Sequence, residues 1–126
     1  MRQCIAFAMA CSVLGCQSGS ERRAEVQSVS AAIDRLRQLP NSDKAPMLEL
    51  LSRLPCSLTD VCELRDRCVR AYRLQVEALD EITALKQAPN NERVAGIDVK
   101  LEAARKLAHE CLENELVVGR RYGTQK

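Results

Sequence analysis

The apolar residues on either side of Pro89-Asn90-Asn91 are arranged symmetrically, and this symmetry constrains the fold more than any other feature. Because residues equidistant from the turn of an antiparallel helical hairpin lie at the same height, such a pattern predicts two helices folded back on each other. Cys68 and Cys111 form the next pair outward, so we expect their sulfurs to face each other across the seam. The matched pairs are Ile82 or Thr83 with Ile97, Leu79 with Leu101, Val76 with Ala104, and Tyr72 with Ala108.

The composition favours helices throughout the chain. A length of 126 residues suits one small domain, and the only aromatic residues are Phe7, Tyr72 and Tyr122. A core built from Leu, Val, Ile and Ala, in a chain with only five Gly and four Pro, is typical of an all-α protein. We therefore predict an all-α fold: a small four-helix bundle built on the long antiparallel hairpin and braced by disulfides.

Two shorter helices are predicted before the hairpin. The first ends near Leu39-Pro40, and the second is capped by residues 41–43, with Pro46 in its first turn. Residues 57–60 resemble a capping box, with Ser57 as the capping side chain, and open the third helix, which continues to about Ala88. The fourth opens at Asn91. The apolar faces of the first two helices are Val26, Val29, Ile33 and Leu36, and Met47, Leu48, Leu51 and Leu54.

The remaining segments complete the predicted domain organisation. Residues 17–20 have the composition of a short flexible tether, with Ser20 as the expected helix N-cap. From Gly119 the chain is basic and has no apolar rhythm, which predicts a frayed tail. We divide the chain into a signal peptide (1–15), an anchor and tether (16–24), a helical domain (25–118) and a basic flexible tail (119–126).

The N-terminal segment has the pattern of an export signal. One positive charge at Arg2 precedes an apolar run that begins at Cys4 and continues through Leu14. About ten apolar residues suit a signal-peptide core, whereas spanning a bilayer takes roughly 20. Cleavage sites of the A-x-A type occur only inside the apolar run, at residues 6–8 and 8–10, where a conventional signal is not cut.

The sequence Val13-Leu14-Gly15-Cys16 resembles the lipobox of bacterial lipoproteins. The resemblance implies cleavage before Cys16, diacylglycerol on the Cys16 sulfur and an acyl chain on the new amine. The mature protein would then be anchored to membrane lipid without spanning the bilayer. Gln17, in the position after the lipidated cysteine, implies by the same resemblance an outer-membrane protein that faces the periplasm.

The cysteine count agrees with lipidation. Of seven cysteines, Cys4 and Cys11 would leave with the signal and Cys16 would carry lipid, so an even number would remain for disulfides. Cys62 and Cys68 are six positions apart, about 120° around a helix and about 9 Å along it, which is too far for a bond. Because Cys68 and Cys111 are expected at the same height of the hairpin, we pair them with each other. Cys56 is then left to pair with Cys62.

Other chemistry for these residues is weighed against the disulfides. Cys56, Cys62, Cys68, His109 and Cys111 together suggest a metal site, but structural zinc sites favour close Cys pairs and no C-x-x-C occurs. We interpret His109 as a partly exposed helix residue. The sequence contains no G-x-S-x-G, H-E-x-x-H or Gly-rich phosphate loop, so we predict no enzyme activity and no catalytic, cofactor or metal residues.

The distribution of charged residues indicates which kinds of partner the protein could bind. The formal net charge of +2 does not suggest nucleic acid. Acidic pairs such as Asp80-Glu81 and the acids at 113 and 115 indicate a solvated surface. Arginines at 65, 67, 70, 73, 120 and 121 suggest a basic end for anionic lipid or a partner, although acids at 60, 63, 66, 110 and 113 lie among them.

The sequence therefore predicts a binding protein of the bacterial envelope. Our first hypothesis is a lipid-anchored, non-catalytic structural or interaction module that docks another envelope protein. The second is an escort for an outer-membrane subunit, which resembles pilotins in size, anchor and cysteine bracing. An exposed apolar groove would favour the escort and a uniformly charged exterior the static module. A metal- or redox-active cysteine protein is the third.

Overall fold

The computed structural model describes residues 18–125, and the predicted signal peptide and Cys16 lie outside this range. These residues form four helices: α1 (Gly19–Gln38), α2 (Asn41–Ser52), α3 (Thr59–Gln87) and α4 (Asn91–Tyr122). No strand occurs within the described range. The predicted all-α four-helix fold is confirmed.

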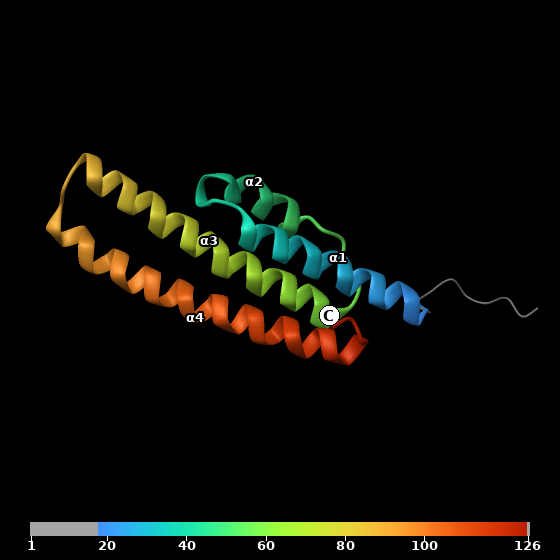
Figure 1. Cartoon of the computed structure of the whole chain (residues 1–126). Helices are drawn as coiled ribbons and strands as arrows, with labels where there is room; N and C mark the ends of the chain where they lie inside the picture. Colours follow the sequence, from blue (N-terminus) through green and yellow to red (C-terminus); the bar gives the residue numbers. More distant parts are fainter. Residues whose placement is uncertain (1–17, 126) are drawn as a thin grey trace, which may run out of the picture.

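The two longest helices form the predicted antiparallel hairpin. α3 and α4 lie side by side and join at one end (Figure 1). At this end the Asn90 side chain caps α4 by accepting a 3.0 Å hydrogen bond from the Glu92 amide. Cys68 and Cys111 are bonded across the seam with their Cα atoms 5.0 Å apart. The equal spacing of residues about the turn thus predicted both the pairing of the helices and their disulfide.

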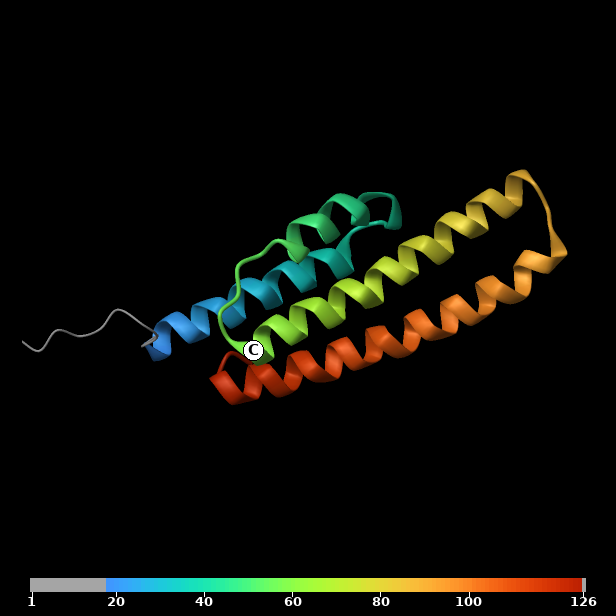
Figure 2. The same cartoon turned by 180° about the vertical axis from the view of Figure 1, so that it is seen from behind.

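The shorter helices cover only part of this hairpin. Seen from both sides, α1 and α2 lie along the half of α3 that is farther from the turn, and the turn projects beyond them (Figure 2). Ala78, Ile97 and Ala104 are buried but stand outside the main core cluster. The hairpin is therefore the axis of the molecule. The cluster consists of Val26, Val29, Ile33, Leu36, Leu48, Leu51, Val61, Leu64, Cys68, Val69, Tyr72, Cys111 and Val118.

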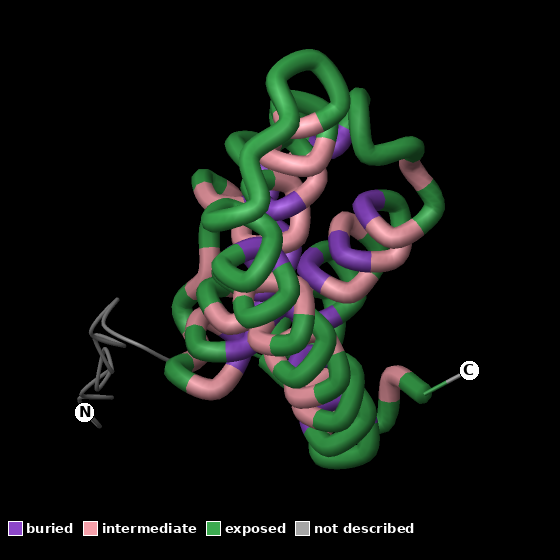
Figure 3. Tube along the Cα trace, turned by 90° about the vertical axis from the view of Figure 1, so that its left-hand side faces the viewer, coloured by how far each residue is buried: buried purple, intermediate pink, exposed green. Residues whose placement is uncertain are grey.

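Burial follows one stripe of each helix. The buried positions of the backbone trace lie on the sides that the helices turn toward one another (Figure 3). On α1 these positions are the four apolar residues predicted from their spacing of three and four. The core is aliphatic apart from Tyr72 and the two half-cystines.

The start of α1 differs from the prediction. Ser18, not Ser20, is the N-cap, because its hydroxyl accepts the Glu21 amide at 3.3 Å while the Glu21 carboxylate accepts the Ser18 amide at 2.9 Å. This reciprocal capping box starts the helix at Gly19. The prediction of a tether through residue 24 is wrong for the part that the structure describes.

The starts of α2 and α3 also differ. Residues 41–43 lie inside α2 instead of capping it, so Pro46 falls in the second turn. Proline has no amide to donate to the carbonyl of Ser42, and the loss is tolerated because Ser42 is exposed to water. The predicted capping box at 57–60 is wrong. The N-cap of α3 is Leu58, and the Ser57 hydroxyl donates to Glu25 of α1 instead of capping its own helix.

The predicted frayed tail from Gly119 is wrong as well. α4 continues to Tyr122, and Gly119 is buried. Gly123 caps the end of the helix, and its φ of 66° is the left-handed conformation that glycine adopts at low cost. Side-chain bonds from Arg121 and Tyr122 to Asp60 of α3 hold this last turn in place.

Candidate functional site

All four cysteines of the helical domain are in disulfides. Cys56 and Cys62 have their Cα atoms 5.5 Å apart and are half-buried, whereas Cys68 and Cys111 are completely buried. Both pairings are those predicted from the sequence. These sulfurs are therefore not thiolates, and residues 18–125 contain no cluster of three or more His, Cys, Asp or Glu side chains placed to hold a metal ion.

His109 lies on the outer surface of α4. Its side chain is 70% exposed, and its Nε2 atom lies 3.2 Å from a carboxylate oxygen of Glu113 on the same helix. The predicted exposed helix residue is thus confirmed.

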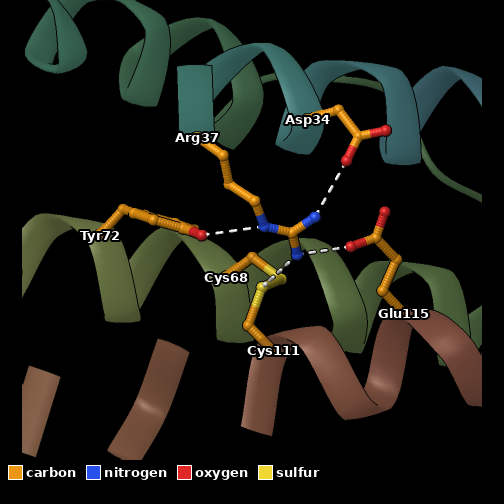
Figure 4. A network of polar contacts seen from close by, with 6 residues as sticks. All are labelled: Asp34, Arg37, Cys68, Tyr72, Cys111 and Glu115. Atoms are coloured by element: carbon orange, nitrogen blue, oxygen red, sulfur yellow. Dashed lines mark hydrogen bonds and ion pairs between the residues drawn. A yellow bond between two sulfur atoms is a disulfide. The ribbon is translucent and has the colours of Figure 1, made fainter. Parts of the chain in front are cut away.

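A polar cluster joins three helices beside the buried disulfide. Arg37 of α1 donates from Nε to the Tyr72 hydroxyl at 3.0 Å and from Nη2 to the Glu115 carboxylate at 2.5 Å (Figure 4). Nη1 binds Asp34 one turn earlier at 2.9 Å, and Nη2 also lies 3.8 Å from Cys111 Sγ. One guanidinium therefore ties α1 to α3 and α4 at the height of the disulfide.

The electrostatics of this cluster favour the charged guanidinium. Burial alone would lower the pKa of Arg37, but the hydrogen bond and charge of Glu115, with a smaller contribution from Tyr72, raise it above its usual value. The Glu115 side chain is only 13% exposed. Glu115 therefore does not belong to the solvated acidic surface predicted for it.

Lys44 fixes the end of α1 against α2. Its side chain is buried, and Nζ donates to the carbonyl oxygens of Leu36 at 3.0 Å and Leu39 at 2.7 Å. Cations are favoured at this position because the last carbonyls of a helix lack amide partners. Nζ also lies 5.9 Å from the centre of the Tyr72 ring. Desolvation by burial lowers the pKa of Lys44.

A shallow groove runs between α1 and α4 on the side of the Arg37 cluster. Its volume is about 370 Å³, and two leucines one turn apart on α4 form its apolar part. Leu112 and Leu116 are 43% and 48% exposed. The groove is lined by Ser30, Asp34 and Arg37 from α1, Leu112, Glu115, Leu116 and Gly119 from α4, and Thr124 and Gln125 beyond it.

A second hollow lies where α1 begins and α4 ends. Gly19, Arg22, Arg23, Arg121 and Tyr122 line its space of about 530 Å³. Tyr122 donates to Asp60, and its pKa is raised by burial first and then by the hydrogen bond and charge of Asp60. The charges of Arg121 and Arg22 oppose this rise. The hollow therefore combines residues from both ends of the described chain.

The predicted basic end is divided among different surfaces. Arg65 donates to the Leu54 carbonyl at 2.7 Å, and Arg73 lies 3.4 Å from Glu49 of α2. Arg121 is instead held by Asp60. Arg65 and Arg73 of α3 thus bind near α2. Arg121 of α4 instead lines the hollow with Arg22 and Arg23, which the sequence interpretation did not include.

No protein-family model, curated protein or solved structure matches the chain. None of the four described helices has an apolar stretch that is long enough to cross a bilayer. Any functional conclusion therefore depends on the residues themselves.

Sequence reasoning missed Arg37, Lys44 and Glu115, although the spacing marks all three. Arg37 follows Ile33 by four positions, and Lys44 precedes Leu48 by four, so both lie on the buried stripes of their helices. Glu115 follows Cys111 by four in the same way. A charged residue in register with a buried stripe is the pattern that would have indicated these contacts.

Proposed function

We propose that this protein is a lipid-anchored lipoprotein of the bacterial envelope that acts as a non-catalytic interaction module. The groove between α1 and α4 carries this proposal, because two exposed leucines line it on a surface held by a buried disulfide and by Arg37. A fixed surface loses little conformational entropy on binding. The partner we propose is another envelope protein.

The groove suits an amphipathic helix. Leu112 and Leu116 lie one turn apart, which is the spacing that a partner helix with apolar residues at i and i+4 would contact. Polar side chains of Ser30 and Asp34 form the opposite wall. An apolar centre with a polar rim is the usual anatomy of a protein interface.

The anchor proposal rests on the lipobox-like Val13-Leu14-Gly15-Cys16 and on the apolar run before it. Acylated Cys16 would hold the domain at the membrane, and Gln17 supports an outer-membrane address facing the periplasm. More than one acyl chain gives stable anchoring where a single chain is marginal.

A pilotin-like escort is the second candidate, and the groove between α1 and α4 is the kind of feature that we expected to favour an escort over a static module. An escort covers an apolar segment of its outer-membrane client during transit, and the groove offers a short apolar site. The two candidates predict different effects of deleting the gene on the partner protein. Deleting an escort would lower the amount of its client in the outer membrane, whereas deleting a static module would leave the client there.

Site-specific photocrosslinking in cells tests the groove. A photoreactive amino acid at Leu116 should give one discrete adduct, and the same probe at exposed Lys106 on α4 should give none. The adduct should disappear when Leu112→Asp is added, because a carboxylate would have to be desolvated in the apolar contact. Equal adducts at both probe positions, or none at either, would contradict the docking proposal.

Intact mass of the membrane-extracted protein tests the anchor. The mature protein should begin at Cys16 and carry two or three acyl chains, and Cys16→Ser should lack this mass. The proposal also expects Cys16→Ser to leave the detergent fraction. A Cys16→Ser protein that still fractionates with detergent would overturn the lipid anchor.

A further inference from the structure

The hollow where α1 begins and α4 ends concentrates guanidinium groups. Arg22 and Arg23 come from the first turns of α1, and Arg121 comes from the last turn of α4. Both views of the ribbon place these helix ends at the same end of the bundle, opposite the hairpin turn. The hollow is therefore a property of the fold and not of one stretch of sequence.

The acidic residues nearby all have partners within the protein, and one of them, Asp60, pairs with an arginine of the hollow. Glu21 accepts the Ser18 amide, and Glu25 accepts the Leu58 amide at 2.9 Å. Asp60 accepts from Arg121 at 2.5 Å and from the Tyr122 hydroxyl at 3.0 Å.

In contrast, Arg22 and Arg23 form no ion pair within residues 18–125, and both are exposed. Their guanidinium groups are thus available to an external anion, and guanidinium groups bind phosphate oxygens well.

The position of the hollow along the chain decides which anion it meets. Two residue steps separate Cys16 from the Ser18 cap, a reach of about 7 Å. From Gly19 the chain is helical, and Arg23 is about 6 Å further along the axis. The polar layer on each side of a bilayer is about 5–8 Å thick. Together these two lengths put Arg23 no more than about 13 Å from Cys16. With lipid on Cys16, the hollow would therefore lie in or just above the polar layer, where long arginine side chains can reach the phospholipid phosphates.

We propose that Arg22, Arg23 and Arg121 bind the phosphates of anionic phospholipids, with Tyr122 at the membrane interface. This inference rests on the proposed acylation of Cys16. Basic residues near an anionic membrane surface strengthen the attachment that lipid chains provide. The contact would fix the orientation of the bundle, and the hairpin turn would then project up to about 45 Å from the membrane.

Chemical modification of arginines in the native lipidated protein tests this contact. We would reconstitute the protein in nanodiscs of phosphatidylcholine alone or with phosphatidylglycerol, react it with phenylglyoxal and map the modified arginines by mass. Arg22 and Arg23 should react about fivefold more slowly in the anionic discs, the effect expected for one basic residue at such a surface. Exposed Arg70 and Arg93 should react at the same rate in both.

Variants and competitors define the outcome. Arg121 should also react more slowly with phenylglyoxal in the anionic discs than in phosphatidylcholine alone. Arg22→Glu with Arg23→Glu should abolish this protection of Arg121, and the matched Arg70→Glu should leave it intact. Equal rates in the two kinds of disc would overturn the inference. Equivalent protection by inorganic phosphate in phosphatidylcholine discs would overturn it too, since it would indicate a site for a soluble anion.

The same digest separates this inference from the anchor. A peptide that begins at Cys16 without lipid would contradict the anchor. A lipidated peptide, together with arginines that phenylglyoxal modifies at the same rate in both kinds of disc, would contradict only the headgroup contact.

Discussion

The Nη2 atom of Arg37 lies 2.5 Å from a carboxylate oxygen of Glu115, and this pair ties together positions 78 residues apart. The same guanidinium bonds Tyr72, so α1, α3 and α4 meet at one point. Cys111 Sγ, 3.8 Å away, places the pair beside the disulfide of the hairpin. The Arg37–Glu115 ion pair and the hairpin disulfide therefore reinforce each other at one height.

Arg37→Leu should lower the free energy of unfolding by about 2 kcal/mol. The substitution leaves the Glu115 carboxylate in a largely buried position without its partner, which costs more than the loss of a surface ion pair. Urea denaturation with both disulfides intact measures the change.

Arg53→Leu is the matched control for Arg37→Leu. Its ion pair with Glu49 is exposed, so the expected loss is below about 0.5 kcal/mol. Adding Glu115→Leu to Arg37→Leu should recover part of the stability, because no unpaired charge remains. Equal losses in the two single variants would contradict a special role for Arg37.

Removing the hairpin disulfide should have the largest effect of any substitution that keeps the fold. Cys68→Ser with Cys111→Ser opens a loop of 43 residues, for which the chain-entropy model gives about 4 kcal/mol. His109→Ala, on the exposed surface of α4, should change stability by less than about 0.5 kcal/mol. Similar small losses in thermal unfolding for both would contradict the brace.

The hairpin could be predicted from the sequence because its information is regular. Apolar residues recur at helical spacing, and their distances from residues 89–91 match on both sides. Two constraints then leave one disulfide pattern. Cys68 and Cys111 lie at equal height in the hairpin, and Cys62 and Cys68 are too far apart on one helix to form a bond. Periodicity and spacing are local properties that tertiary contacts did not override.

The helix ends could not be predicted in the same way, because remote side chains decide them. Glu25 binds the Leu58 amide 33 residues later and thereby replaces the Ser57 cap that the local pattern indicated. Asp60 holds Arg121, 61 residues away, and so extends α4 through a basic segment without apolar rhythm. The groove and the arginine hollow depend on such contacts between distant segments.

The two disulfides should be reduced in a fixed order. Cys56 lies just before α3 and Cys62 in the first turn of α3, and both are half-buried, whereas Cys68 and Cys111 of the hairpin bridge are completely buried. Thiol–disulfide exchange requires direct access of the attacking thiolate. Mild dithiothreitol treatment followed by alkylation and peptide mapping should therefore label Cys56 and Cys62 first.

Denaturant provides the control for this order. In urea near the unfolding midpoint, Cys68 and Cys111 should become labelled at a rate that follows unfolding. Labelling of the hairpin cysteines as fast as Cys56 in the native protein would show that the seam opens locally.

Stability should fall at alkaline pH through Tyr122. Its pKa in the folded protein is raised above 10.0 by burial, and then by the hydrogen bond and charge of Asp60. The folded state therefore holds this proton more tightly than the unfolded state. The stabilisation is present below pH 10 and is lost as the pH rises from there through the folded pKa.

Tyr122→Phe tests this pH dependence directly. At neutral pH it should cost about 1 kcal/mol, the usual value of one hydrogen bond, because Asp60 loses a donor. Above pH 10 the difference in free energy of unfolding between Tyr122→Phe and the wild type should shrink, because the wild type then loses the phenol proton that bonds Asp60. Tyrosinate absorbance should also lose its late titration step. A difference in urea midpoint that stays constant across this pH range would show that the hydrogen bond to Asp60 does not control the ionisation of Tyr122.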